Sequence, residues 1–478
     1  MRILDNNSRY KHTGLFTDFY ELAMAQAYFY EDKASEEAVF DYFYRKNPFG
    51  GGYVVFSGIG ELLHSIRKFK YSEEDIAYLQ TQGFRKEFLG FLKNFRFKGT
   101  IKAPAEGEIV FPGEPLLVIK GNILELQLIE TLVLNILNFS SLISTKASRI
   151  RNVSGKRPFS DFGLRRAQGA GGVLASRAAI IGGANSTSNV LSGFHYGLPI
   201  GGTMAHSWIQ TFGSEIEAFR TFARQYPDNA VLLVDTYNTL ESGLPNAIEV
   251  AKELEQQGHR LKAIRLDSGD LAYFSKKARK MLDENDLNYV KIVASNQLDE
   301  YVIRSLTLQN APIDSFGIGT KLITGNETSA LDGVYKLSVY NHHPRMKVSD
   351  NIEKTTLPGE KKTMRYLHDD GTFYADGILL DEEKDMKEIA HPHFSHKRSD
   401  ISGYKAEPIL KAVMQQGEIT REDISAKESA AYAQKRLRQL PDEHKRIEFP
   451  HQYKVGISES LEALRDKIFK NIKERRKL

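Results

Sequence analysis

The chain has 478 residues, of which 41% are hydrophobic and 26% are charged, a balance typical of a folded globular protein with two or three domains. Its formal net charge of +4 is too small to indicate, by itself, nucleic acid or an acidic membrane surface as a partner. Cysteine is absent, which excludes disulfides, thiolate catalysis and cysteine-based metal sites and suits a reducing compartment.

The polar N-terminal segment lacks the continuous apolar region of a secretory signal. We find no window that approaches the roughly 18 uncharged apolar residues of a spanning helix. We therefore expect a cytoplasmic protein without a membrane or nucleic-acid partner.

An α+β domain is predicted for residues 1–140. A helix is expected over 16–30, where Asp18 and Glu21 have the spacing of a capping box. The β-branched and aromatic residues 38–43 predict a strand, and the Pro/Gly-punctuated stretch 99–120 predicts a small β-module. Residues 123–151 carry apolar side chains at helical spacing and predict one long core helix.

Residues 141–337 repeat one pattern, in which short apolar runs end in small or polar residues and alternate with amphipathic helices. Several of these ends lie about thirty residues apart, the length of a βα unit, and predict a parallel sheet that is either closed as a barrel or open. The strand ends are Ser160-Asp161-Phe162-Gly163, Gly202-Thr203, Val234-Asp235-Thr236, Arg265-Leu266-Asp267-Ser268-Gly269, Ala294-Ser295-Asn296 and Gly317-Ile318-Gly319-Thr320.

A C-terminal extension is predicted for residues 338–478. The alternating stretches 364–367 and 372–378 indicate antiparallel hairpins, and the tail from Arg421 reads as helix rich in lysine, arginine and glutamate.

The segment from Gly197 to Ser207 contains the first candidate for chemistry, because two glycines and Thr203 lead from an apolar run to His206. A single histidine after a strand is more often a hydrogen-bonded structural residue than a catalytic one. In a parallel sheet, however, all the strand ends above lie at one rim, where ligands bind.

Two groups at this rim suit a phosphorylated sugar. Backbone N–H groups and hydroxyls of the glycine-rich and Ser-Asn strand ends can hold a phosphate, at Gly317, Gly319, Thr320, Ser295 and Asn296. Arg265 and Asp267, two apart on a strand, point to the same side. Asp161, Asp235 and Asp267 could pair with arginines or bind Mg²⁺, and capping of the next helix is an equal alternative for each.

The neighbouring Arg165 and Arg166 lie beside Phe162 in the sequence. Two guanidinium groups next to an aromatic ring favour a flat anionic ligand, stacked on the ring and held at its carboxylate or phosphate.

Taken together, these stretches resemble the nicotinate phosphoribosyltransferase family over nearly the whole chain. Seven motifs stand in the family's order: Thr17-Asp18-Phe19-Tyr20-Glu21-Leu22-Ala23-Met24, Phe162-Gly163-Leu164-Arg165-Arg166-Ala167-Gln168-Gly169, Ser186-Thr187-Ser188-Asn189-Val190, Gly202-Thr203-Met204-Ala205-His206-Ser207, Asp235-Thr236-Tyr237, Arg265-Leu266-Asp267-Ser268-Gly269-Asp270 and Gly317-Ile318-Gly319-Thr320. The resemblance implies an irregular, TIM-like α/β barrel of the type II phosphoribosyltransferases behind an N-terminal β-rich α+β domain. It also implies a homodimer with shared active sites.

The reaction that the resemblance implies joins nicotinate to 5-phosphoribosyl 1-pyrophosphate, giving nicotinate mononucleotide and pyrophosphate. It is of the ligase type, because ATP hydrolysis is coupled to it through a phosphorylated histidine, and it belongs to NAD salvage. ATP is then a co-substrate and Mg²⁺ a cofactor.

The resemblance also implies a role for each motif residue. Phe162 stacks on the pyridine ring, and Tyr20 from the other subunit covers its opposite face. Arg165, beside Arg166, contacts the nucleotide phosphate, and Gly202, next to Thr203, lets the backbone approach the ligand. Arg265 and Asp267 hold the ribose and its phosphates, and His206 is the phosphate acceptor. Asp235 lies near the pyrophosphate and Mg²⁺. The 5′-phosphate is held by Ser295, Asn296, Gly319 and Thr320.

Three classes of alternative stay open: a phosphoribosyltransferase for another base, a phosphosugar aldolase or isomerase, and a non-catalytic binding protein. A related enzyme takes nicotinamide and has an aspartate where this chain has Ser188; a carboxylate there would repel nicotinate, so Ser188 with the arginine pair favours the acid. Quinolinate is another possible base. A phosphosugar aldolase or isomerase would need a lysine or glutamate at a strand end, and a non-catalytic binding protein would release no pyrophosphate.

Overall fold

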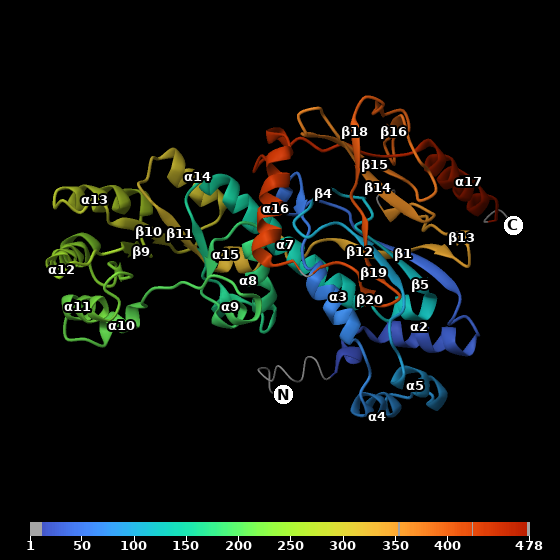
Figure 1. The fold of residues 1–478 in the computed structure, drawn as a ribbon, viewed down its shortest axis with the longest axis horizontal. Helices are drawn as coiled ribbons and strands as arrows, with labels where there is room; N and C mark the ends of the chain where they lie inside the picture. The colour runs from blue at the N-terminus through green and yellow to red at the C-terminus, as the bar shows by residue number, and fades with distance from the viewer. Residues whose placement is uncertain (1–11, 352–353, 423, 476–478) are drawn as a thin grey trace. The chain divides into compact units, whose positions relative to one another are not determined.

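The computed structural model describes residues 12–351, 354–422 and 424–475 (Figure 1). The chain forms two compact units, one of Met1–Thr145 with Ala330–Leu478 and one of Lys146–Ser329. The segments expected as an N-terminal domain and a C-terminal extension thus lie in the same unit. Strand β12 (Gly333–Tyr340) runs across the boundary expected at residue 337 and pairs antiparallel with β1 (Glu37–Tyr44).

The first unit is built on a seven-stranded antiparallel sheet in the order β13-β12-β1-β5-β3-β19-β20. Its further strands are β13 (His343–Pro344), β5 (Leu117–Asn122), β3 (Thr100–Ala103), β19 (Lys411–Gln415) and β20 (Glu418–Ile419). Six helices carry apolar side chains that pack with this sheet in one core: α2 (Phe19–Tyr30), α3 (Ile59–Lys68), α4 (Glu73–Thr81), α5 (Lys86–Lys93), α6 (Ile123–Gln127) and the first part of α7 (Glu130–Ser154). Phe40 and Tyr335, on neighbouring strands, stack with ring centroids 4.6 Å apart in this core.

Two expectations for the first helices are wrong. Asp18 precedes α2 but makes no side-chain cap, because its Oδ2 accepts from Thr131 Oγ1 at 3.2 Å. The Glu21 carboxylate likewise accepts from the Thr131 backbone N–H, at 2.9 Å. The long helix expected over 123–151 is divided into α6 and α7 (Glu130–Ser154).

The run Ile123–Ser154 is, within the described residues, the one helical stretch long and apolar enough to cross a membrane, contrary to our expectation that none would be. Two thirds of its most apolar window, 67%, is buried inside the protein, as in a core helix. Its length and composition are therefore weak evidence for a membrane span.

The C-terminal part of the first unit holds the expected hairpin, formed by β14 (Lys361–Leu367) and β15 (Phe373–Leu380). The hairpin belongs to a mixed sheet in the order β17-β16-β21-β15-β14-β18. The other strands of this sheet are β17 (Arg398–Asp400), β16 (Glu388–Ala390), β21 (Val455–Ile457) and β18 (Lys405–Pro408). The helices of this part are α16 (Ala426–Gln439) and α17 (Glu459–Arg475). Elsewhere in the first unit, β2 (Val54–Val55) and β4 (Ile109–Val110) form a separate two-stranded sheet.

A buried ionic cluster joins this C-terminal part to the N-terminal segment. Arg365 of β14 makes a two-pronged contact with Asp376 of β15, at 2.9 and 2.6 Å, and its third nitrogen donates to Glu108 at 2.6 Å. Arg436 of α16 donates to the same Glu108 at 2.8 Å. Because these charges are buried and paired, each depends on the others for compensation.

The second unit contains six parallel strands in the order β7-β6-β11-β10-β9-β8. They are β6 (Phe159–Asp161), β7 (Ser186–Thr187), β8 (Val231–Leu233), β9 (Ala263–Leu266), β10 (Lys291–Ser295) and β11 (Ser315–Ile318). Their apolar residues are largely buried, as in sheets covered on both faces. The predicted parallel βα arrangement is confirmed.

Helices follow the strands: α8 (Gly171–Ile181), α9 (Val190–Tyr196), α10 (His206–Gln210), α11 (Glu215–Gln225), α12 (Leu244–Gln256), α13 (Leu271–Asp283), α14 (Glu300–Leu308) and α15 (Thr320–Ile323). Helix α13 packs against β9 and β10 (Figure 1). The spatial order of the strands is the chain order shifted cyclically, and a parallel bridge adds Ile200 beside β7 at Thr187. Among the described residues, no strand pairing joins Ile200 to β8, so the ladder is open there.

Candidate active site

Arg265, on β9, connects three strand ends of the second unit. Its Nε donates to Ser295 Oγ at 2.8 Å, one terminal nitrogen donates to Thr203 Oγ1 at 2.7 Å, and the other donates to Asp267 Oδ1 at 2.8 Å. Asp267 follows β9, Ser295 ends β10 and Thr203 follows the Gly201-Gly202 stretch. The guanidinium therefore fixes the predicted rim residues relative to one another.

Asp267 is the anion at the centre of this network. Its Oδ1 also accepts from Ser295 Oγ, and its Oδ2 lies 3.6 Å from His206 Nε2. Burial raises the pKa of Asp267, but hydrogen bonds from Ser295 and Arg265 and the nearby positive charge outweigh it and hold the pKa below its ordinary value. Asp267 is therefore ionised at neutral pH.

His206 is the first residue of α10, with its ring between two partners. Nδ1 lies 3.1 Å from Thr236 Oγ1, on the side opposite the Asp267 carboxylate. The side chain is 40% exposed, so the ring is held in place and still open to a ligand. Thr236 had no predicted role, although it follows Asp235 directly in a motif; its position beside that strand-end aspartate was the available signal.

Asp235 follows β8, and one of its two carboxylate oxygens accepts hydrogen bonds while the other accepts none in the described chain. Oδ2 accepts from the Asp267 backbone N–H at 2.9 Å and from Ser268 Oγ at 2.5 Å. Oδ1 is buried and has no hydrogen-bond partner among the described residues. An oxygen of this kind fits Mg²⁺, which binds through one or two carboxylates and completes its shell with substrate phosphates and water. No cluster of three histidine or acidic side chains suited to a metal occurs in the described ranges, so the protein alone offers an incomplete site.

A π-helix, η4 (Thr239–Gly243), sets the course of the chain just after Asp235. It packs so closely that a Cβ on Gly243 would lie 1.8 Å from the Val234 carbonyl oxygen. Glycine is therefore required at 243 for the loop that carries Asp235 and Thr236 to keep this path.

The predicted phosphate cradle comes from two neighbouring loops, because β10 and β11 pair with Ser295 opposite Gly317. A Cβ on Gly317 would lie 2.5 Å from the Phe162 ring, so glycine is needed for that ring to sit there. Asn296 and Gln297 both have positive φ, 83° and 48°, an uncommon conformation for residues other than glycine that is found at functional loops.

The Phe162 ring lies next to the network as predicted, with the Arg265 guanidinium 5.7 Å from its centroid. Arg165 and Arg166 occupy the 3₁₀ turn η3 (Leu164–Arg166) that follows, both exposed and without an ion pair in the described part of the chain. Ser188 is half-buried, and its backbone N–H donates at 2.8 Å to the carbonyl of Asp161, the residue that ends β6 and precedes Phe162.

Asp161 has a structural role, and its hydrogen bonds favour that alternative over the suggested use for Mg²⁺. It is fully buried, and its carboxylate accepts from Gly163 N, Ser176 Oγ and Thr187 Oγ1, each at 2.8 Å. Burial raises its pKa, and both oxygens are already used to join β6, α8 and β7.

Gly202 and Tyr20 are two further predicted residues. Gly202 is exposed, with open space where a Cβ would be, so packing within the described chain does not require glycine there. Tyr20 belongs to the first unit, on α2, where its side chain is 45% exposed. Burial, with the hydrogen bond and charge of Glu130, raises the pKa of its phenol.

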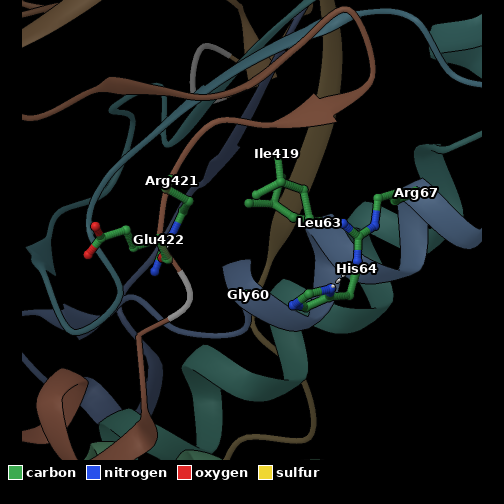
Figure 2. Close-up of a pocket in the computed structure, with 7 residues that line it drawn as sticks. All are labelled: Gly60, Leu63, His64, Arg67, Ile419, Arg421 and Glu422. Atoms are coloured by element: carbon green, nitrogen blue, oxygen red, sulfur yellow. Dashed lines mark hydrogen bonds between the residues drawn. The ribbon is translucent and has the colours of Figure 1, made fainter.

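The first unit also has a small hollow, drawn in Figure 2, between α3 and the end of β20. It is lined by Gly60, Leu63, His64, Arg67, Ile419, Arg421 and Glu422. In Figure 2 the His64 ring and the Arg67 guanidinium approach each other on one side, joined by a contact of 3.4 Å, while Arg421 lies on the other. None of the predicted site residues lines this hollow, so the rim of the second unit is the candidate active site.

Comparison with known proteins gives the family. Residues 15–138 match the model of the nicotinate phosphoribosyltransferase N-terminal domain, residues 158–378 that of the nicotinate phosphoribosyltransferase family, and residues 360–465 that of its C-terminal domain. A nicotinate phosphoribosyltransferase of Bacillus subtilis is 39% identical over 461 residues, covering 93% of each chain. The Homo sapiens enzyme of that name is 33% identical, over 96% of this chain and 97% of its own.

Solved structures agree with this assignment. The crystal structure of human nicotinic acid phosphoribosyltransferase superposes with a TM-score of 0.85 at 31% identity, over 94% of this chain and 99% of that one. A nicotinate-nucleotide pyrophosphorylase from Pyrococcus furiosus shares the fold, with a TM-score of 0.72 at 23% identity over 91% of this chain and 97% of its own. The chain belongs to the nicotinate phosphoribosyltransferase family.

Proposed function

We propose that this chain joins nicotinate to 5-phosphoribosyl 1-pyrophosphate, giving nicotinate mononucleotide and pyrophosphate, as a step of NAD salvage in the cytoplasm. The observation that carries the proposal is the network of Arg265, Asp267 and His206, which brings a ribose-binding anion next to an accessible histidine. The family membership supports the choice of substrates.

The transfer needs positioning and charge more than a protein nucleophile. The bond between C1 of the ribose and the pyrophosphate oxygen breaks as the pyridine nitrogen approaches C1, and positive charge develops on the sugar. Ionised Asp267 faces that charge, while Phe162 stacks on the pyridine ring and Arg165 binds phosphate. The Asp235 carboxylate would hold Mg²⁺, which would supply positive charge to neutralise the leaving pyrophosphate.

ATP coupling is assigned to His206. A ring nitrogen attacks the γ-phosphorus of ATP, an N–P bond forms, the bond to the β-phosphate oxygen breaks, and ADP leaves. Later hydrolysis of phosphohistidine releases phosphate. Thr236 and Asp267 orient the ring on its two sides, which supports this role because an acceptor must keep one geometry through the cycle.

Three features complete the proposal. Ser188, which carries no charge, and the exposed pair Arg165 and Arg166 favour nicotinate over nicotinamide. The cyclic strand order of the second unit supports an irregular barrel, TIM-like in type. The exposed Tyr20 supports a homodimer in which Tyr20 of the partner subunit covers the pyridine ring.

Initial rates with the purified chain test this function. Nicotinate, nicotinamide and quinolinate are compared at equal concentrations, each with 5-phosphoribosyl 1-pyrophosphate and Mg²⁺, with and without ATP, and mononucleotide and pyrophosphate are quantified. We expect nicotinate mononucleotide with equimolar pyrophosphate, formed faster with ATP. A preference for nicotinamide or quinolinate would reject the choice of base, and binding without pyrophosphate release would reject catalysis.

A further inference from the structure

Lys321 lies directly after Thr320, at the start of the short helix α15. Its Nζ is 3.8 Å from Asp299 Oδ2, and its side chain is 28% exposed. Asp299 caps helix α14, where its other oxygen, Oδ1, accepts from the backbone N–H groups of Tyr301 and Val302 at 3.0 and 2.9 Å. The lysine therefore reaches from the loop after β11 to the loop after β10.

The two loops that Lys321 connects are those assigned to the sugar phosphate, and they contain little positive charge. Within residues 295–299 and 317–321, Lys321 is the one cationic side chain. Arg265 lies nearby, but its donors are committed to Ser295, Thr203 and Asp267, and its charge is paired with Asp267.

A phosphate monoester has a charge of about −1.5 to −2 near pH 7 and binds best where a cation is present. Backbone and hydroxyl donors such as Thr320 Oγ1 orient a phosphate but do not neutralise it. We propose that Lys321 binds the 5′-phosphate of the ribose substrate and exchanges Asp299 for it when the substrate enters. The proposal rests on the function above and deepens it by naming the cation of one subsite.

The geometry with Asp299 favours this exchange. At 3.8 Å the ammonium group is attracted to Oδ2 but lies beyond the 2.7–3.2 Å of a formed N–H···O hydrogen bond. The helix-capping hydrogen bonds of Asp299 are on Oδ1, so they remain when the lysine leaves. The flexible lysine side chain can therefore turn toward a phosphate without unfolding the start of α14.

A purely structural role is the rival explanation, in which the Lys321–Asp299 pair only joins α15 to α14. Two substitutions separate the explanations. Lys321→Met removes the cation under either explanation, whereas Asp299→Asn removes the lysine's partner and keeps a residue that caps helices as well as aspartate does. A phosphate ligand needs Lys321 alone, and a structural pair needs both residues.

Binding of ribose 5-phosphate, measured by calorimetry on the full-length protein, is the test. We expect Lys321→Met to weaken binding about tenfold or more, the usual effect of losing a hydrogen bond from a charged group. Lys321→Arg should retain most of the affinity, and Asp299→Asn should bind as well as the native chain or better. Affinity for pyrophosphate should not change in Lys321→Met.

Two controls bound the result. Lys291→Met removes an exposed lysine at the opposite end of β10 and should leave ribose 5-phosphate binding unchanged. Ribose without phosphate should bind native chain and Lys321→Met alike. Native affinity in a folded Lys321→Met, or equal weakening in Lys321→Met and Asp299→Asn, would overturn the proposal. Mononucleotide formation by the native chain is assayed in parallel, so failure of the lysine's role is distinguishable from failure of the proposed function.

Discussion

Replacing Asp267 by asparagine removes one charge from the centre of the candidate site while keeping the size of the side chain. In the native chain the carboxylate accepts from Arg265 at 2.8 Å and from Ser295, and it lies 3.6 Å from His206. Asparagine keeps one oxygen for these donors, but the charge that faces the developing cation on the ribose is lost.

The expected magnitude follows from these contacts. Removing one preorganised charge-stabilising group from an active site costs about 2.7–4 kcal/mol in the transition state, or 10²- to 10³-fold in rate. The folded state also loses charge assistance in two hydrogen bonds, roughly 1–3 kcal/mol in total. We therefore expect a folded enzyme whose loss in kcat/KM, expressed as free energy, exceeds its loss in stability.

The assay measures kcat/KM for 5-phosphoribosyl 1-pyrophosphate at saturating nicotinate, with thermal unfolding recorded in parallel. Asp270→Asn is the matched control, because Asp270 lies in the same loop, caps α13 through a bond to Tyr273 N, and asparagine caps equally well. The reasoning would be refuted if Asp267→Asn kept kcat/KM within threefold of the native value, or if Asp270→Asn lost as much.

The remaining predictions concern four other positions. His206→Ala should keep the fold and some ATP-independent transfer and lose stimulation by ATP; full stimulation in a coupled ADP-release assay would reject the phosphohistidine. Asp235→Asn should require more Mg²⁺ for half-maximal rate, which a metal titration checks, because it alters a carboxylate whose buried Oδ1 has no hydrogen-bond partner in the described chain. Gly317→Ala should raise KM for nicotinate by roughly 10- to 100-fold, since the new methyl group lies 2.5 Å from the Phe162 ring and must displace it; an unchanged KM would contradict that steric reasoning. Arg365→Met should lower the free energy of unfolding by about 3–5 kcal/mol in a denaturant titration, because it leaves Glu108 and Asp376 buried without their shared cation.

The rim could be predicted from the sequence because its signals are local and periodic. Strand ends such as Val234-Asp235 and Leu266-Asp267 recur one βα unit apart, and parallel strands bring such ends to one edge. Even so, the sequence did not distinguish the role of Asp161 from that of Asp235, because both aspartates stand at or just beyond the ends of buried strands. The difference lies in partners from other elements, since Ser176 and Thr187 occupy the Asp161 carboxylate and leave it no free oxygen.

Local patterns failed where a distant residue competes for a side chain. Asp18 and Glu21 have capping-box spacing, yet Thr131, on α7, takes the Glu21 carboxylate through both its backbone and its hydroxyl. A contact between residues 110 positions apart has no counterpart in a local motif. The same applies to His206 and Thr236, whose contact depends on the parallel packing of two βα units.

The C-terminal third illustrates this limit on a larger scale. Its role was not predictable from sequence because Arg365 and Glu108 are separated by 257 positions, and nothing local marks them as partners. Burial raises the pKa of Glu108, but Arg365 and Arg436 outweigh it and hold the pKa below its ordinary value, so the carboxylate stays ionised inside the protein. Because a buried charge is costly without its partner, the N-terminal segment around Glu108 depends on both C-terminal arginines. The C-terminal segment that carries Arg365 and Arg436 is therefore part of the buried interior of the first unit and not an appendage to it.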